Sequence, residues 1–510
     1  MAIPPLRKWA NRTIINRACS YGETRPRPFS SMPPRGDERD PSIVSYTSWE
    51  SLTDQRWFSR HLPAKEMTAL PPVEEVRKLF EVGSRTPVLS KQSSLLFPAF
   101  AQWFTDGFLM TDANDTRRTF SHHQIDFNPL YGLTREQTVA LRLCSEAAGQ
   151  KGFLKVEMRG DEVYAPKLYD DGGNVRPEFS VLRPPLGFDD YLKTLPPLDA
   201  IRLKRSIFAF GGERANSTPY TAMLNTLFLR EHNRIAAELQ KENTGWDDER
   251  VFQTARNINM VLLIKIVIEE YINHIAPQYF RLTADPSVCW SAPWNKPIWV
   301  PIEFNLLYRW HSLSPDRFEI GGRTYDPRDV IFNTGLLMDT GLGELMEAAS
   351  RQRAWELGLF NIPGFLLFVE ARSVLQGRTN KVGSYNDYRE AFKFPRVTRF
   401  EQVTDDLDRI DALRKLYGEV DNIEFFVGLF AEPILPLGAL PSLLKRIVAF
   451  DAFSMALTNP LLSEHVFNET TFTKSGMSLI AATGCLQDIL NRNLRPGQKA
   501  KASMDYALAA

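Results

Sequence analysis

The sequence predicts a mainly α-helical protein, and two features of its hydrophobic pattern support this fold class. Apolar residues recur every three and four positions through 218–243 and 247–277, which is the periodicity of helices with a buried face. Alternating apolar and polar residues, the pattern of strands, are confined to short runs, chiefly within 153–169. The chain shows no internal repeat, which argues against a solenoid.

The chain divides into an N-terminal arm, residues 1–45, and a folded body, residues 46–510. Residues 22–45 are rich in Pro, Arg and Ser and predict an extended segment without regular structure. The stretch before them is basic, carries Leu6 and Trp9 among its arginines, and lacks the continuous apolar run of a secretory signal. Three interpretations stay open for it: an arm docked on the body, an organelle transit peptide, or a helix at a membrane surface.

Capping signals predict the ends of the two longest helices. Ser217 or Thr218 supplies the N-cap oxygen of the first, followed by a proline suited to the first turn. Gly245 breaks the chain after this helix, and Asp247 or Asp248 begins the second. We therefore expect two long helices joined by a short turn. Helical patterns of the same kind cover 93–110, 340–358 and 384–394.

Charge and cysteine content exclude several classes of protein. Lys+Arg and Asp+Glu both total 61, so no bulk charge draws the chain to nucleic acid. The four cysteines are far apart and form no CxxC pair, which disfavours a disulfide framework or a zinc site and suits a reducing compartment. The best transmembrane candidate, 260–271, is interrupted by Lys265 and ended by Glu269 and Glu270, so we expect no membrane span. The expected location is cytoplasmic, with peripheral membrane contact and organelle targeting left open.

Tyr308 and His311, in the run "EFNLLYRWHSL", are the first candidates for chemistry. On a helix, residues three apart share one face, so a group bound by the imidazole would lie near the phenol. The chain has no HExxH motif and no Cys/His cluster, which disfavours a zinc hydrolase, whereas haem iron needs only one axial imidazole. Taken alone, a histidine on an apolar helix is more often a core residue, so the pair needs supporting motifs.

Six segments supply that support, within a match of order and spacing that covers roughly residues 44–490. They are "VSYTSWESLTDQRWFSRHLPA", "LFLREHNRIAAEL", "IKIVIEEYINHI", "EFNLLYRWHSLSPD", "SYNDYREAFKF" and "FAEPILPLGALP". In order and spacing they resemble the animal-type haem peroxidase and cyclooxygenase superfamily, and most of all its prostaglandin-endoperoxide synthases and fatty-acid dioxygenases. The resemblance implies a large single-domain helical fold that holds haem b between a distal and a proximal helix.

The resemblance also implies roles for the residues on the proximal side. His311 matches the proximal haem ligand, and Tyr308 matches the tyrosine that becomes a radical and abstracts a hydrogen atom from a fatty acid. Tyr271 matches a tyrosine that hydrogen-bonds the radical tyrosine, and Ile272 matches a channel-lining aliphatic residue. An oxidised haem can draw an electron from a nearby phenol, while the protein supplies position and a dry site.

The distal side departs from the family's pattern. The family places a Gln and a His four residues apart, and this chain has Gln102 followed by Asp106 in the place of the histidine. A distal histidine shuttles the proton that eases peroxide cleavage, so its replacement puts peroxidase turnover in doubt. A buried carboxyl group with a raised pKa can transfer the same proton, and the alternative for Asp106 is to cap a loop or bind a cation.

Two further positions concern the substrate. Arg17 is the best match to the arginine that pairs with the fatty-acid carboxylate near the channel mouth. Val448 lies near the position of the serine that aspirin acetylates in mammalian cyclooxygenases, so the resemblance implies a channel without that serine. The cysteine-rich module of the animal enzymes is also missing, in agreement with the low cysteine count.

The sequence thus predicts a haem-dependent fatty-acid dioxygenase in which Tyr308 starts oxygenation of an unsaturated fatty acid by O2, giving a hydroperoxide or an endoperoxide. One alternative is an α-dioxygenase or a hydroperoxide-metabolising haem enzyme that uses the same residues. Another is a haem-binding or lipid-binding relative without turnover. We expect no nucleic-acid partner, and we leave open the oligomeric state, with a dimer among the options, and peripheral membrane contact through the arm.

Overall fold

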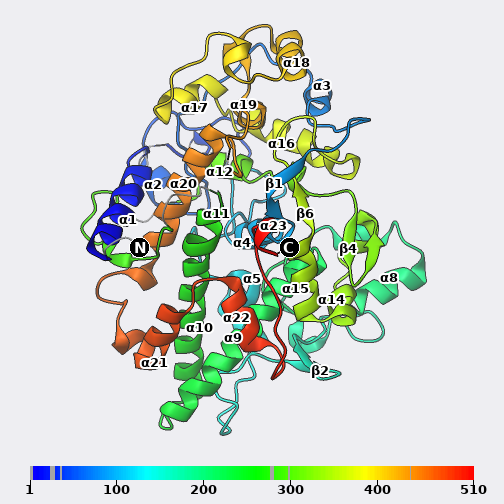
Figure 1. The fold of residues 1–510 in the computed structure, drawn as a ribbon, viewed down its shortest axis with the longest axis vertical. Helices are drawn as coiled ribbons and strands as arrows, with labels where there is room; N and C mark the ends of the chain where they lie inside the picture. The colour runs from blue at the N-terminus through cyan, green and yellow to red at the C-terminus, as the bar shows by residue number, and fades with distance from the viewer. Residues whose placement is uncertain are drawn as a thin grey trace.

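Helices make up most of the structure, as predicted. The computed structural model describes residues 4–22, 29–34, 37–275, 281–296, 299–436 and 438–509. Among these residues the strands form three two-stranded antiparallel sheets, and Figure 1 shows β1 and β6 near the centre of the molecule and β2 at its lower edge. The strands are β1 (Leu89–Ser94), β2 (Glu157–Arg159), β3 (Glu162–Tyr164), β4 (Phe318–Ile320), β5 (Arg323–Tyr325) and β6 (Arg353–Trp355). β2 and β3 form a hairpin within the segment predicted to be strand-like.

The helices follow the chain in this order. The first half contains α1 (Pro4–Cys19), α2 (Trp49–Thr53), α3 (Val73–Lys78), α4 (Leu96–Asp106), α5 (Asn128–Tyr131), α6 (Arg135–Leu141), α7 (Phe188–Leu192), α8 (Pro197–Lys204), α9 (Pro219–Glu242) and α10 (Asp248–Ile266). The second half contains α11 (Asn273–Ile275), α12 (Ile302–Leu307), α13 (Pro327–Val330), α14 (Gly335–Thr340), α15 (Leu342–Arg351), α16 (Leu367–Thr379), α17 (Tyr385–Ala391), α18 (Leu407–Tyr417), α19 (Phe425–Ala431), α20 (Ser442–Leu457), α21 (Glu469–Ala482), α22 (Leu486–Asn493) and α23 (Tyr506–Ala509).

α9 and α10 pack along each other and form the scaffold of the lower half in Figure 1. Their starts are where the capping signals predict them. The Thr218 side chain accepts a hydrogen bond from the Thr221 backbone nitrogen, and the Asp247 side chain accepts one from Arg250. α4, α15 and α22 pack on α9, and α21 packs on α10, so this pair organises much of the core.

α10 continues into a π-helical segment, η3 (Val267–Ile272), and then into α11. The combined segment 248–275 is long and apolar enough to cross a membrane, but it packs against α9 and α21, and 72% of its most apolar stretch is buried inside the protein. Its charged residues have partners within the fold. Lys265 pairs with Glu269 at 2.6 Å, and the Glu270 carboxylate accepts a hydrogen bond from the Leu486 backbone. It is therefore a core helix.

α12 ends at Leu307, so the prediction that Tyr308 and His311 share one helix is wrong. Tyr308 leaves helical geometry with φ −97° and ψ 19°, and His311 begins a separate 3₁₀ turn, η5 (His311–Leu313). The indole N–H of Trp310 donates to the Leu307 carbonyl at 2.6 Å. The helix can stop here because this bond satisfies one of the carbonyls that a helix end leaves without a partner.

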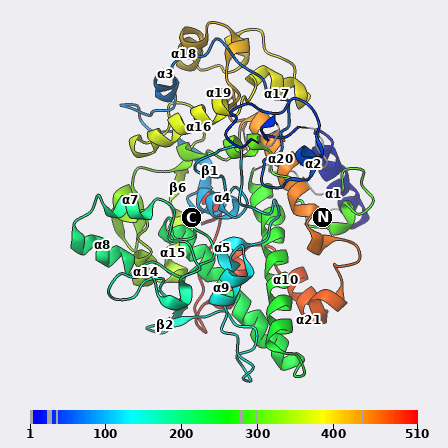
Figure 2. The ribbon, with the colours of Figure 1, turned by 180° about the vertical axis from the view of Figure 1, so that it is seen from behind.

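The N-terminal helix α1 is docked on the body. Its buried side is formed by Asn11, Ile15 and Cys19, and it packs against α20, as the views in Figures 1 and 2 agree. The Asn11 side-chain amide exchanges two hydrogen bonds with the Thr283 backbone. This contact is the one expected of an arm docked on the body. It is also compatible with a helix that rests on a membrane surface through its other side.

Gly211 tests how closely the loop before α9 is packed. A methyl group at Gly211 would overlap the backbone of Gly132 and Asn128, whereas one at exposed Gly245, between α9 and α10, would meet nothing within 4 Å. We expect Gly211→Ala to lower the free energy of unfolding by about 1–3 kcal/mol, the usual cost of overpacking. Denaturant or thermal unfolding of both variants measures this, with Gly245→Ala as the control. Equal midpoints for the two variants would show that the loop can move aside.

Candidate active site

A cavity of about 380 Å³ brings together residues from five separate parts of the chain. They are α4 with the residues beside it, the segment before and at the start of α9, the segment from α12 to η5, residues 318–332, and residues 365–366. The side chains in this lining that could take part in acid–base, metal-binding or radical chemistry include Gln102, Asp106, Arg214, Tyr220, Tyr308, Arg309 and His311. The predicted distal and proximal residues therefore face one space, although Tyr308 and His311 do not lie on one helix as the sequence suggested.

α4 is buried around most of its circumference. Its less buried positions are Pro98, Gln102 and Asp106, which lie four residues apart and all line the cavity. Residues at this spacing share one face of a helix, so the helix turns its apolar sides to the core and one narrow stripe to the cavity. This arrangement confirms the expected i, i+4 relation of Gln102 and Asp106.

His311 lines the cavity, and one of its two ring nitrogens already takes part in a hydrogen bond. Its Nδ1 is bonded to the carboxylate of Glu370, on α16, and the Glu370 side chain is fully buried while that of His311 is 21% exposed. A bond at Nδ1 sets which nitrogen carries the proton and leaves Nε2 as the atom that can bind a metal. Sequence reasoning missed Glu370, which lies in a helix 59 residues further along the chain.

Tyr308 and Tyr271 form a buried pair of phenols. Burial raises the pKa of Tyr308 above its ordinary value, and burial and the neighbouring Tyr308 raise that of Tyr271. The two phenols are close enough to affect each other's pKa, yet neither hydroxyl has a partner of good hydrogen-bond geometry among the described residues. Both therefore stay protonated at neutral pH, and the predicted hydrogen bond between them stays a prediction.

The local backbone explains how Tyr271 comes to lie beside Tyr308. Tyr271 and Ile272 both belong to the π-helical segment η3, and both are buried. A π-helical turn inserts an extra residue into a helix and is common at functional sites, because it redirects the side chains that follow. Ile272 is thus in the core next to Tyr271, and its predicted place along a channel stays a prediction.

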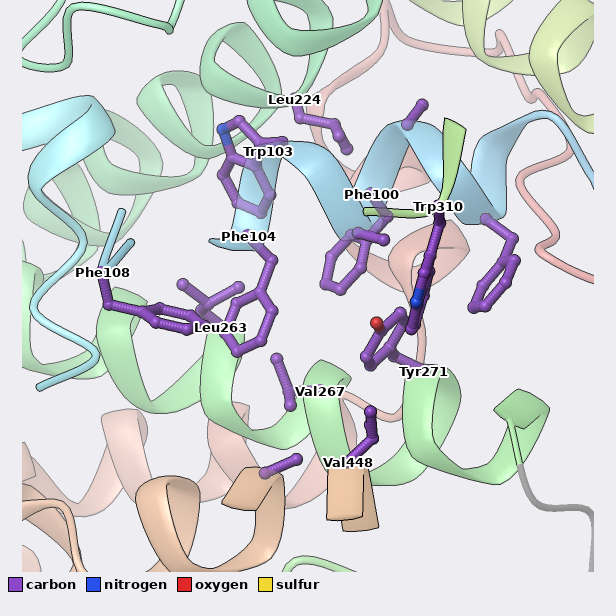
Figure 3. Close-up of a cluster of buried hydrophobic side chains, with 14 of the residues drawn as sticks. Phe100, Trp103, Phe104, Phe108, Leu224, Leu263, Val267, Tyr271, Trp310 and Val448 are labelled. Carbon is purple, nitrogen blue, oxygen red and sulfur yellow. The ribbon is translucent and has the colours of Figure 1, made fainter. Parts of the chain in front are cut away.

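Tyr308 belongs to a series of packed aromatic rings. The ring contacts form a closed series in the order Tyr308, Phe304, Phe108, Phe104, Tyr271 and Trp310, with centroid separations from 4.6 to 6.3 Å. Figure 3 shows how α4, the helix of Leu263 and Val267, and α20 with Val448 all direct apolar side chains into this region. Val448 is fully buried there. These packed side chains keep water away from the Tyr308 ring, and their surfaces are of the apolar kind that can contact a hydrocarbon chain.

The polar end of the cavity holds Asp106 and Arg214. Asp106 Oδ1 lies 3.7 Å from Arg214 Nη1, and Oδ2 is buried with no hydrogen-bond partner among the described residues. Burial raises the pKa of Asp106 to about 7, against the opposing charges of Arg214 and Arg309. A carboxyl group with this pKa can take up and release a proton near neutral pH. Arg214, from the run "GGERANS", was not predicted, because no local pattern marks a loop arginine as part of a site.

The cavity fits a haem group better than a bare metal ion. No cluster of three or more His, Cys, Asp or Glu side chains in the described part of the chain could hold a metal ion, whereas one imidazole with a free nitrogen suits haem iron. Arg309 lines the same cavity, and its buried Nε has no hydrogen-bond partner within the described ranges. Burial lowers the pKa of Arg309 to about 10, so it remains a cation that can pair with a haem carboxylate.

Arg17 lies apart from this cavity. It is on the exposed side of α1, where its Nε donates to the Tyr21 hydroxyl at 3.2 Å, and it is not among the residues that line the cavity. α1 packs on α20, the helix of Val448, so Arg17 belongs to the layer outside the apolar region. Its predicted pairing with a fatty-acid carboxylate stays a prediction.

Comparisons with known proteins agree with this geometry. The sequence profile of the family described as animal haem peroxidase matches residues 119–504. The chain is 30% identical to prostaglandin G/H synthase 2 of Bos taurus over 465 residues, covering 88% of this chain and 73% of the relative, and 30% identical to prostaglandin G/H synthase 1 of Oryctolagus cuniculus, covering 88% and 72%.

Solved structures share the fold. The fatty acid alpha-dioxygenase of Oryza sativa aligns with a TM-score of 0.71 at 17% sequence identity, covering 99% of this chain and 93% of its own. Peroxidase A of Dictyostelium discoideum aligns with a TM-score of 0.69 at 18% identity, covering 90% of this chain and 97% of its own. Sequence and fold thus point to the same group of proteins.

The raised pKa of Asp106 predicts a pH dependence of stability. The folded protein holds this proton more tightly than the unfolded chain, so the associated stability is fully present below about pH 4 and is lost as the pH rises through about 7. We expect the unfolding midpoint of the wild type to fall more between pH 5 and pH 8 than that of Asp106→Asn, which cannot titrate. Parallel pH profiles for the two proteins would contradict the raised pKa.

Proposed function

The chain belongs to the animal haem peroxidase family, and we propose that it oxygenates fatty acids through a radical on Tyr308. It is a haem-dependent oxidoreductase with the mainly α-helical fold of that family. One observation carries the proposal. Tyr308 lines the same cavity as His311 and also packs against the rings of Phe304 and Trp310, so its phenol lies between the candidate haem site and the apolar core. The curated relatives are prostaglandin G/H synthases, and one solved neighbour is a fatty acid alpha-dioxygenase variant with palmitic acid.

His311 would hold the iron through Nε2, and Arg309 would offset the negative charge of a haem carboxylate. When bound, haem supplies a one-electron oxidant beside Tyr308. Tyr308 would give one electron to that oxidant, and its phenolic proton would pass to water in the cavity that the tyrosine lines. Because burial disfavours the phenolate, the tyrosine acts as a neutral radical and not as a base.

The radical oxygen of Tyr308 takes a hydrogen atom from a C–H bond of the fatty acid, which leaves a carbon radical and restores the phenol. O2 adds to the carbon radical, and the resulting peroxyl radical takes a hydrogen atom back from Tyr308, which gives the hydroperoxide and renews the tyrosyl radical. The rings of Phe304 and Trp310, 4.6 and 4.7 Å from that of Tyr308, hold the phenol in place and keep water away.

Gln102, Asp106 and Arg214 would act on a peroxide at the other end of the cavity. Asp106 can accept a proton from one peroxide oxygen and return it to the other, because its pKa is close to neutral. Arg214 lies close enough to offset the negative charge on the oxygen that leaves. This pair supports peroxide activation even though the family's distal histidine is replaced.

An α-dioxygenase is the second candidate, because the fold of the Oryza sativa enzyme covers almost the whole chain. The same Tyr308 and His311 would act, and only the carbon presented to Tyr308 would differ. The position of the new oxygen in the product, determined by mass spectrometry after incubation with palmitic, linoleic and arachidonic acids, separates the two reactions.

Replacing Tyr308 with phenylalanine tests the radical mechanism. We expect Tyr308→Phe to keep the haem Soret band and to lose oxygen uptake with fatty acids by at least 100-fold, because phenylalanine cannot form the radical. Oxygen uptake by the purified haem-loaded protein measures this, with Tyr46→Phe, on the exposed surface, as the control. His311→Ala should instead lose the haem ligation signal. Oxygen uptake that persists in Tyr308→Phe would exclude the mechanism.

We also propose that α1 rests on a membrane surface. Leu6 and Trp9, three residues apart on this helix, are 55% and 63% exposed, and Arg7, Lys8 and Arg12 beside them are exposed as well. Apolar side chains within a basic helix favour contact with anionic lipid. A peripheral position would let fatty acids pass from the bilayer to the apolar region near α20.

Vesicle sedimentation tests this membrane contact. With vesicles that contain phosphatidylserine, we expect the double variant Leu6→Ala, Trp9→Ala to bind about tenfold more weakly than the wild type, because it removes the apolar area available to the lipid. Leu407→Ala, which removes an exposed leucine on α18, is the control. Equal binding by all three proteins would rule out α1 as the contact.

A further inference from the structure

Glu370 is a fully buried carboxylate that the proposed mechanism does not use. It lies on α16, which packs against α12, α3 and α19, and its neighbours Leu367 and Val374 on the same helix are also buried. Its Oε1 is bonded to His311 Nδ1, and its Oε2 has no hydrogen-bond partner among the described residues. The carboxylate therefore directs its one described bond at the imidazole that would bind haem iron.

Fold stability alone does not explain a carboxylate at this position. Removing a charged group from water costs several kcal/mol, and a well-packed apolar side chain is usually as stable in its place. The other charged group close to Glu370 is the Arg309 guanidinium, but the described hydrogen bond of Arg309 goes from Nη2 to Gln376 Oε1 at 3.0 Å. The imidazole of His311 is thus the direct hydrogen-bond partner of the buried Glu370 carboxylate.

We propose that Glu370 is a positioning residue that makes His311 a strong electron donor to the haem iron. The inference rests on His311 being the haem ligand of the proposed function. By accepting the Nδ1 proton in a hydrogen bond, the carboxylate fixes the ring orientation and increases the basicity of Nε2. A more basic axial ligand stabilises the oxidised iron and so lowers its reduction potential.

This arrangement would compensate for the change on the distal side. The acid group facing a peroxide is Asp106 in place of a histidine, and electron donation from the proximal ligand helps to break the O–O bond. His311, made a stronger electron donor by Glu370, and Asp106, the weaker proton shuttle, would then act together on the same bond. Glu370 acts through His311 and touches neither substrate nor peroxide.

The test uses the haem-loaded full-length protein and the variant Glu370→Gln, which keeps the size of the side chain and a carbonyl acceptor but removes the charge. We expect the iron–histidine stretching band of the ferrous protein, measured by resonance Raman spectroscopy, to shift to lower frequency. We also expect the haem reduction potential to shift to a more positive value, and haem affinity to fall on the order of tenfold. Glu370→Asp, which keeps the charge but retracts it, should shift the same band in the same direction by a smaller amount.

Ser373→Ala is the matched control. It removes a buried polar group from the same helix, but the Ser373 hydroxyl bonds only within α16, to the Val369 carbonyl at 2.9 Å, so the band and the potential should not change. An unchanged band and potential in both Glu370 variants would overturn the inference and leave the proposed function intact. A wild-type protein without an iron–histidine band, or with a band that survives in His311→Ala, would overturn the ligand assignment and with it both proposals.

Discussion

The end of α12 is the constraint on which the rest of the site depends. The bond from the Trp310 indole to the Leu307 carbonyl closes the helix and lets the chain turn into η5. In this turn Tyr308 packs between the rings of Phe304 and Trp310 while it lines the same cavity as His311. The proposed haem ligand and the proposed radical-forming phenol are thereby held in one short irregular segment. Aromatic packing fixes its position on one side, and the hydrogen bond from His311 to a buried carboxylate fixes it on the other.

The two sides of Tyr308 differ in polarity, and this difference orders the chemistry. Asp106, Arg214 and Arg309 face the cavity, where burial shifts the pKa of the carboxyl group and of Arg309 toward neutrality. In the ring series Tyr308 contacts the buried rings of Phe304 and Trp310. Low polarity keeps the phenol neutral, so it is better suited to exchange hydrogen atoms than protons. Proton transfer and hydrogen-atom transfer are thus assigned to opposite ends of one site.

Local signals predicted the scaffold well, because they depend on residues that are close in sequence. Thr218 and Asp247 cap α9 and α10 as expected, since an N-cap bond spans only three residues. The prediction of one regular helix for Tyr308 and His311 was wrong because the end of that helix depends on residues outside the local sequence. Whether a helix continues past Leu307 depends on tertiary packing, which places the Trp310 indole on the helix end, and periodicity alone does not report this.

The sequence by itself determined the helical fold class, the family, and the identity of Tyr308 and His311 as a pair, because these are written in residue types at short spacing and in motifs spread along the chain. Only the tertiary structure decided which groups surround that pair. Arg214 comes from a loop and Glu370 from a distant helix, and each has a role only through contact with Asp106 or His311. Burial is likewise a property of the folded chain, and it is burial that raises the pKa of Asp106.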